Sequence, residues 1–258
     1  MMLTQIREEQ LIILKYFTEL CKEYSLTYFL DGGTLAGTQL YKGYLPLDDD
    51  IDIAMPRSDY ETLITLIVSE NSSDFTIDSF RTNPSCHICF AKIKKRGTKY
   101  HEVTTNQATE NFIDIFPLDR VIKRHGLIWS VRVWAIQNLK GILFLRQIKK
   151  EISMSKKILF YSTNIFSNPL IYKMLNRLMT YQNKKNAAFL ANFPGMVRKE
   201  ECASTCSDYF PPVEKQFCNI QVNVPHNSEQ IIRDIYGKGT YQHKQVQHFQ
   251  TRKEPTTK

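Results

Sequence analysis

The chain has 258 residues and a net charge of +8, with 42% hydrophobic and 23% charged residues. This balance excludes a disordered or fibrous protein and fits a globular one of one large or two small domains. The polar start carries no export signal, and no segment reaches the about 20 apolar residues of a membrane span. We therefore expect a cytoplasmic protein whose six cysteines are reduced thiols.

The first elements alternate between helix and strand. Residues 5–24 carry apolar side chains at helical spacing, residues 26–30 predict a buried strand, and residues 35–41 predict a short helix. Between the last two, Asp31-Gly32-Gly33-Thr34 predicts a tight turn. Its glycines let the backbone approach a ligand, and amide groups at the start of a helix favour phosphate. The alternative is a plain turn without a ligand.

Four carboxylates follow within five positions, at Asp48, Asp49, Asp50 and Asp52. Such charges repel one another unless a cation or a partner neutralises them. Residues 51–55 predict a strand, and side chains alternate along a strand, so Asp50 and Asp52 are expected on one face. Two carboxylates on one face suit Mg²⁺, which shares its oxygen ligands with substrate phosphates. A solvated acidic loop accounts for Asp48 and Asp49, but not for Asp52 in its apolar strand.

The next segment predicts one helix and three strands. Ser58, as N-cap with Glu61 three residues on, forms a capping box for a helix to about residue 68. Strands are expected over residues 75–80 and 88–94, as a hairpin. Residues 111–116 predict a third strand, ended by Pro117.

Asp114 lies inside that third strand, among apolar neighbours. A carboxylate in such a place needs a partner. It is either a structural hydrogen-bond acceptor or the third ligand of a metal held by Asp50 and Asp52, and the sequence leaves both readings open. On the strand before it, Lys92 is a candidate phosphate contact, although a charged strand edge is the alternative.

The middle of the chain is basic and predicts helices over residues 127–190, with no strand pattern. Residues 120–185 hold 14 Lys and Arg and one acid, so this segment carries +13 and the rest of the chain −5. The excess indicates an anionic partner, either the inner face of an anionic membrane or a glycan, or else a solvated helical face. Only the positive charge supports binding of a nucleic acid, and we expect no nucleic-acid partner. The aromatic residues expected at a membrane interface are Trp129, Trp134, Phe144 and Phe160.

The C-terminal part returns to mixed structure. Residues 220–224 predict a strand, residues 228–236 a helix closed by Gly237, and the tail after His248 is expected to fray. The whole pattern indicates an α+β protein with a small mixed sheet flanked by helices and an inserted helical subdomain. We predict a catalytic core over residues 1–125, a basic helical insertion over 126–200, and a part over 201–258 that completes the catalytic domain.

Several of these segments resemble the LicD family of bacterial phosphotransferases, to which fukutin-type proteins belong. The resemblance covers residues 25–120 well and 205–250 loosely. Two departures stand out, because Leu47 replaces the usual tryptophan, and Leu40 and Tyr41 stand where the family often has arginine and histidine. The matching segments are residues 31–37 (DGGTLAG), 42–53 (KGYLPLDDDIDI) and 112–119 (FIDIFPLD), with Tyr236, Gly237 and His248 near the C-terminus.

The resemblance implies a nucleotidyltransferase-like fold, in which Asp50, Asp52 and Asp114 are catalytic and bind Mg²⁺, with Mn²⁺ as a substitute. One of these carboxylates, Asp52 or Asp114, takes the proton of the acceptor hydroxyl in this reading. Asp48 and Asp49 support the site from the loop. His248 in the tail either reaches the site or is a solvated surface residue. The expected substrate-binding residues are Gly32, Gly33, Thr34, Asp48, Asp49, Lys92 and His248.

The resemblance also implies an activity. It is the transfer of a phospho-alcohol, such as phosphocholine, from a CDP-alcohol donor to a sugar hydroxyl of a cell-surface glycan, with lipopolysaccharide, capsule and teichoic acid as acceptors. Such an acceptor can be lipid-linked. A metal-dependent glycosyltransferase is the rival, because it also holds a nucleotide sugar with an Asp-x-Asp motif. That class does not usually place a glycine turn just upstream or a third carboxylate in an IDIFP-like strand.

Overall fold

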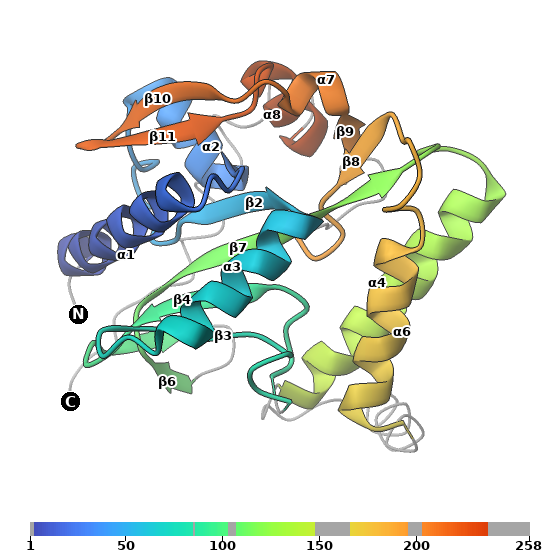
Figure 1. Ribbon diagram of the computed structural model, residues 1–258, viewed down its shortest axis with the longest axis horizontal. Helices are drawn as coiled ribbons and strands as arrows, with labels where there is room; N and C mark the ends of the chain where they lie inside the picture. Colours follow the sequence, from blue (N-terminus) through green and yellow to red (C-terminus); the bar gives the residue numbers. More distant parts are fainter. Residues whose placement is uncertain (1–2, 85, 103–106, 148–165, 196–202, 237–258) are drawn as a thin grey trace, which may run out of the picture.

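A mixed seven-stranded sheet runs through the part of the chain that the structure, a computed structural model, describes: residues 3–84, 86–102, 107–147, 166–195 and 203–236 (Figure 1). Helices flank it, as the sequence predicts for an α+β protein. The strands of the sheet are β1 (Phe29–Leu30), β2 (Asp52–Pro56), β3 (Phe75–Asp78), β4 (Ala91–Lys95), β7 (Phe112–Val121), β8 (Phe189–Ala191) and β9 (Ala203–Thr205).

The strand order is β1-β2-β7-β4-β3; β8 pairs with the C-terminal end of β7, and β9 pairs with β8. Only β2 and β7 run parallel, and this central pair sets Asp52 directly beside Asp114. The other pairs in the sheet are antiparallel, including the predicted β3–β4 hairpin. Two small hairpins lie apart from the sheet, β5 (Tyr100–Glu102) with β6 (Gln107–Thr109), and β10 (Val213–Phe217) with β11 (Ile220–Val224).

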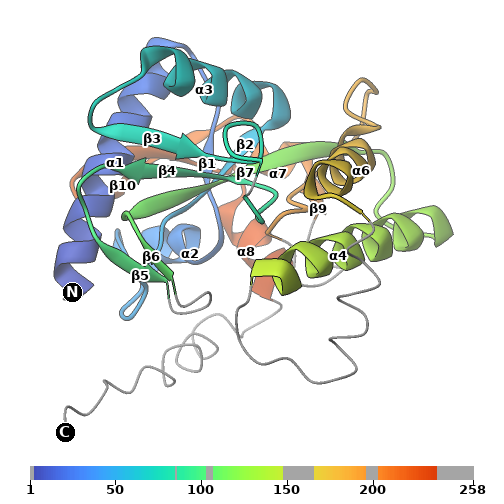
Figure 2. The same ribbon diagram turned by 90° about the horizontal axis from the view of Figure 1, so that it is seen from below.

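Helices cover both faces of the sheet, with α3 (Arg57–Glu70) on one side and α2 (Gly32–Tyr41) and α8 (Ser228–Tyr236) on the other (Figure 2). The long helix α1 (Leu3–Glu23) packs against β4, β7 and β11, and the short α7 (Cys206–Tyr209) packs against α8 and β9. One apolar core joins these elements. The predicted helices over 5–24 and 228–236 are confirmed.

A second apolar cluster joins two further helices, α4 (Leu127–Gln147) and α6 (Asn168–Thr180), to the end of β7. Trp129 of α4 and Phe193, two residues after β8, pack together in it, with ring centroids 5.8 Å apart. None of the helices in the described ranges is both long and apolar enough to cross a bilayer. The boundaries predicted at residues 125 and 200 stay predictions.

Three local predictions are wrong in detail. Gly32, Gly33 and Thr34 form the first turn of α2 and not a separate turn before it. The predicted capping box at Ser58 is absent, because α3 already begins at Arg57, with Pro56 as the preceding cap residue and no side-chain cap bond. The first N–H groups of α3 therefore receive no acceptor from the cap side chain, and the negative charge of Asp59 in the first turn complements the helix dipole instead.

The third correction concerns Pro117, which lies inside β7 and does not end it. Asp114 donates its N–H to Ile51 on the β2 side, so the nitrogen of Pro117, three residues on, faces the opposite side. On that side β4 pairs with β7 only as far as Ile115 of β7, and the pairing of β7 with β8 starts at Asp119 of β7. The missing N–H therefore falls in the gap between two partner strands, where it costs no ladder bond.

Strands β5, β6, β8, β9 and β10 were not predicted. β8 contradicts the expectation of helices alone over residues 127–190. It has only three residues, too few for a periodic pattern, and pairing with β7 decides its conformation. Gly237, His248 and the tail lie outside the described residues.

Candidate active site

The acidic site lies where β2 and β7 run side by side. Asp52 opens β2 and is the direct neighbour of Asp114 in the parallel register. Burial raises the pKa of Asp52 well above its usual value, and the charges of Asp50 and Asp114 raise it further. The structure therefore brings together the three carboxylates that sequence reasoning singled out. Asp50 precedes β2 and is not part of the strand.

The start of α2 positions Asp52. The backbone N–H of Asp52 donates to the Thr34 hydroxyl at 2.9 Å, and the N–H of Asp31 donates to the Asp52 carbonyl at 2.9 Å. Gly32 has φ +53°, and a Cβ at this residue would lie 2.8 Å from Oδ2 of Asp52. The glycine thus lets a carboxylate approach the N-terminus of α2, where backbone N–H groups favour negative charge.

Gly32→Ala should therefore damage the site more than the fold. The left-handed backbone costs an alanine about 1–2 kcal/mol, and the new methyl group must displace the Asp52 carboxylate. A shift of about 1 Å at a reacting group can cost roughly 10²-fold in rate, so activity should fall by more than stability alone explains.

The matched control is Gly141→Ala in α4, where an added Cβ meets nothing within 4 Å. It should stabilise the protein by about 0.5–1 kcal/mol and leave activity unchanged. Thermal unfolding and turnover of both variants check this prediction, and a Gly32→Ala enzyme of normal activity would contradict the placement of Asp52.

Helix α1 holds the loop that carries the remaining acids. The Arg7 guanidinium donates to the carbonyl of Leu45 at 2.7 Å and to that of Asp48 at 2.8 and 2.9 Å. Gln10, buried on the inner face of α1, donates to the carbonyl of Asp49 at 2.7 Å. Sequence reasoning missed both residues. The available signal was a glutamine on the apolar face of a helix, which needs a buried partner.

Asp48 and Asp49 are not solvated, contrary to the alternative of an exposed acidic loop. They are 8% and 7% exposed, and the Tyr100 hydroxyl donates to Asp49 Oδ2 at 3.1 Å. Burial raises the pKa of Asp48 to about 9, with further contributions from the charge and hydrogen bond of Asp50. Burial also raises the pKa of Asp50. Acids crowded together in this way favour the binding of a proton or a cation, which relieves the repulsion between their charges.

Lys92 reaches into this site from β4. Its Nζ lies 3.0 Å from Oδ1 of Asp114 and 3.4 Å above the centre of the Phe112 ring, and the residue is 9% exposed. The alternative of a charged strand edge is therefore wrong for Lys92, because β4 lies between β3 and β7. Its ammonium group provides a positive charge for Asp114 or for an anionic ligand beside it.

Two further residues join the site from distant parts of the chain. Asn192, just after β8, donates its side-chain amide to Oδ2 of Asp31 at 2.7 Å. Asp31 is 5% exposed, and burial raises its pKa. Tyr236, the last residue of α8, has a pKa raised by burial and then by the charges of Asp52 and Asp31. Sequence reasoning placed Asp31 and Tyr236 in motifs but gave neither a role.

The kind of donor atom suits a hard divalent cation, because such ions take carboxylate oxygens and neutralise crowded acids. Asp50, Asp52 and Asp114 supply such oxygen atoms. In the described part of the chain, however, no three His, Cys, Asp or Glu side chains are placed so that they could hold a metal ion as they stand, and Lys92 already contacts Asp114. Binding of Mg²⁺ or Mn²⁺ therefore stays a prediction.

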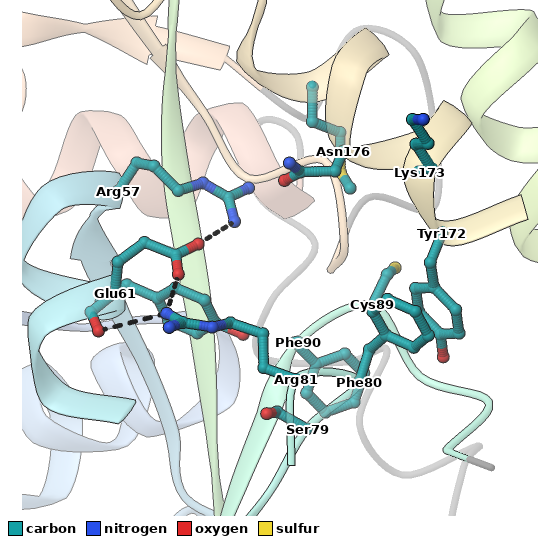
Figure 3. A pocket seen from close by; sticks show the side chains of 12 residues that line it. Arg57, Glu61, Ser79, Phe80, Arg81, Cys89, Phe90, Tyr172, Lys173 and Asn176 are labelled. Atoms are coloured by element: carbon teal, nitrogen blue, oxygen red, sulfur yellow. Dashed lines mark hydrogen bonds and ion pairs between the residues drawn. The ribbon is translucent and has the colours of Figure 1, made fainter. Parts of the chain in front are cut away.

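A cavity of about 500 Å³ lies elsewhere, between α3, α6 and residues 79–81 and 89–90 (Figure 3). Arg57 and Arg81 both contact Glu61 in its wall, so these charges are balanced. Arg57 also pairs with Asp119, which is five residues beyond Asp114 on β7, or roughly 17 Å along the strand. The cavity is thus separate from the acidic site.

The fold and the acidic centre define an α+β enzyme, and comparison with known proteins gives its family. Residues 25–165, more than half of the chain, match the family described as LicD/FKTN/FKRP, nucleotidyltransferase domain, and the chain belongs to that family. It is a LicD-type transferase. It is 28% identical over 194 residues to the lipopolysaccharide cholinephosphotransferase LicD of Haemophilus influenzae, an alignment that covers 73% of this chain and 69% of the relative.

Proposed function

We propose that this enzyme transfers a phospho-alcohol, phosphocholine or a close analogue, from a CDP-activated donor to a sugar hydroxyl of a cell-surface glycan. One observation carries the proposal. The charges of four acids, Asp31, Asp48, Asp50 and Asp114, raise the pKa of Asp52, and burial raises the pKa of Asp31, Asp48, Asp50 and Asp52. Such a centre is poorly neutralised by the protein itself and suits a cation shared with phosphates. The family and the named relative support a glycan acceptor and a nucleotidyltransferase-type fold.

In this proposal the first turn of α2 receives a phosphate of the donor. The first N–H groups of a helix have no acceptor within the helix, and the helix dipole favours an anion there. Gly32 and Gly33 keep that surface free of side chains. Lys92, which contacts Asp114, offers a second positive group to the same anion.

The acceptor hydroxyl must lose its proton as it attacks phosphorus. Asp52 and Asp114 are the two candidates for the base, and the Lys92–Asp114 ion pair favours Asp52, because an ammonium at 3.0 Å makes Asp114 a weaker base. Mg²⁺ held by Asp50, Asp52 and Asp114 would supply charge neutralisation on the donor diphosphate.

The test is a donor screen with the purified chain. CDP-choline, CDP-glycerol and CDP-ribitol are compared with nucleotide sugars, with and without Mg²⁺. We expect CMP release from a CDP-alcohol, lost on removal of the metal by a chelator. Release of a nucleoside diphosphate from a nucleotide sugar would instead show the rival glycosyltransferase. Mass spectrometry of the surface glycan from cells with the active protein or its Asp52→Asn variant then identifies the group transferred.

A further inference from the structure

Helix α4 is apolar on two opposite sides. One side packs into the molecule, where Trp129, Val133 and Ile136 are at most 4% exposed. A surface helix that packs one face inward normally presents polar residues to solvent on the other. Here the outward side of the first two turns carries large apolar residues, at 80%, 77%, 54% and 66% exposure. They are Leu127, Ile128, Val131 and Trp134.

These four residues, which we call the α4 patch, form one continuous surface. Their spacing of i, i+1, i+4 and i+7 places them on neighbouring positions of the same side of the helix. Asn138, one turn beyond Trp134, is exposed and ends the patch. In both views the start of α4 forms the right-hand edge of the molecule, on the far side from α1 (Figures 1 and 2). No described element covers it in those views.

The surroundings of the α4 patch are positively charged. Residues 120–147 and 166–195 contain ten Lys and Arg and no Asp or Glu. Arg120 and Lys123, just before α4, are exposed. Four cations of α6 and the turn after it are also exposed: Lys173, Arg177, Lys184 and Lys185. Arg132 does not add to this surface, because its guanidinium turns inward and donates to the carbonyls of Leu178 and Met179.

We propose that the α4 patch binds peripherally to the surface of an anionic bilayer. Exposed aliphatic side chains with a tryptophan, bordered by exposed cations, are the combination that holds a helix at a lipid interface. A nucleic acid would use the cations but leave the aliphatic residues unexplained. A second copy of the chain would bring two surfaces of the same charge together, which disfavours self-association through this face.

The geometry also revises which aromatic residues reach the interface. Trp129 is 4% exposed and packs against Phe193, so the expectation for Trp129 is wrong. Trp134 and Phe144, at 66% and 45% exposure, face outward. Phe160 lies outside the described residues.

The test is flotation of the full chain with vesicles of phosphatidylcholine alone or mixed with phosphatidylglycerol, at low and at high salt. The patch variant carries Ile128→Gln and Trp134→Gln. The matched control carries Ile12→Gln and Val68→Gln, two residues that are 48% and 55% exposed on α1 and α3. We expect the wild type and the control to float with the anionic vesicles at low salt. The patch variant should bind about tenfold less or worse, since it withdraws two apolar side chains from the interface.

A charge variant, Arg120→Ser with Lys123→Ser, should weaken binding to anionic vesicles and leave any binding to neutral ones unchanged. Near-UV circular dichroism establishes that each variant is folded. The proposal is overturned if the folded wild type does not bind anionic vesicles, or if the patch variant binds as well as the wild type. It is also overturned if light scattering finds a dimer that the patch variant abolishes. Binding is measured without donor or acceptor, so its outcome is independent of the proposed transfer reaction.

Discussion

Asp52→Asn should strongly reduce transfer while leaving the metal-free protein at least as stable as the wild type. The asparagine keeps the shape of the side chain but removes a charge that lies close to Asp50 and Asp114. Loss of one charged group that holds the donor phosphates and their cation corresponds to about 3–4 kcal/mol, or roughly 10²–10³-fold in kcat/KM. A residue with a purely structural role would lose stability together with activity.

The raised pKa values of Asp48, Asp50 and Asp52 also make the stability of the protein depend on pH. A folded-state pKa above the unfolded value means that the folded protein keeps a proton that the unfolded chain has released, so stability is lost as pH rises between the two values. For Asp48 this window runs from 3.8 to about 9. The metal-free wild type should therefore unfold at lower temperature as pH rises through this window. Asp52→Asn should reduce the slope, and added Mg²⁺ should reduce it in the wild type.

Asp74→Asn is the matched control, because Asp74 is an exposed acid in the turn before β3. It should change neither the turnover nor the pH dependence of unfolding beyond about 0.5 kcal/mol. Calorimetry across pH and a CMP-release assay make the two measurements. Full Mg²⁺-dependent transfer by the Asp52→Asn variant would remove Asp52 from the site.

Asp119→Ala should cause the largest loss of stability. The Asp119 side chain is fully buried and accepts two bonds from Arg57, Nε to Oδ1 at 2.9 Å and Nη2 to Oδ2 at 2.6 Å. Asn183 donates to the same carboxylate at 2.6 Å. Alanine would leave a buried guanidinium without its main partner, which costs about 3–5 kcal/mol. Transfer per folded molecule should be retained, because Asp119 is roughly 17 Å along β7 from Asp114.

Two comparisons separate this ion pair from ordinary surface charge. Glu61→Gln removes a partner of Arg57 that is 37% exposed, and it should cost at most about 1 kcal/mol. The double variant Arg57→Met with Asp119→Leu should recover much of the loss, because replacing both buried charges with apolar groups removes the uncompensated one. Urea unfolding of the four proteins measures these differences. A single Asp119→Ala variant of near-normal stability would contradict the structural role of the pair.

The acidic centre was predictable because its parts are local in sequence. The acids before β2, the glycines before α2 and the carboxylate in an apolar strand each leave a pattern that short-range rules detect. Their meeting depends on one long-range fact, the parallel pairing of β2 with β7, which places Asp52 beside Asp114 and was not predicted. Residues that reach the centre from afar, such as Asn192 and Gln10, leave no such pattern, because their partners lie 161 and 39 residues away.

By itself the sequence determined the class of the protein, the three central carboxylates and the concentration of positive charge in the middle of the chain. These depend on residue identity and short spacing, which the chain carries whatever its fold. Only the tertiary structure decided that Asp48 is buried, that Lys92 contacts Asp114, and that Trp134 faces outward where Trp129 packs inward. Burial and pairing are decided by which distant segments come together, and neighbouring residues in the chain do not record that.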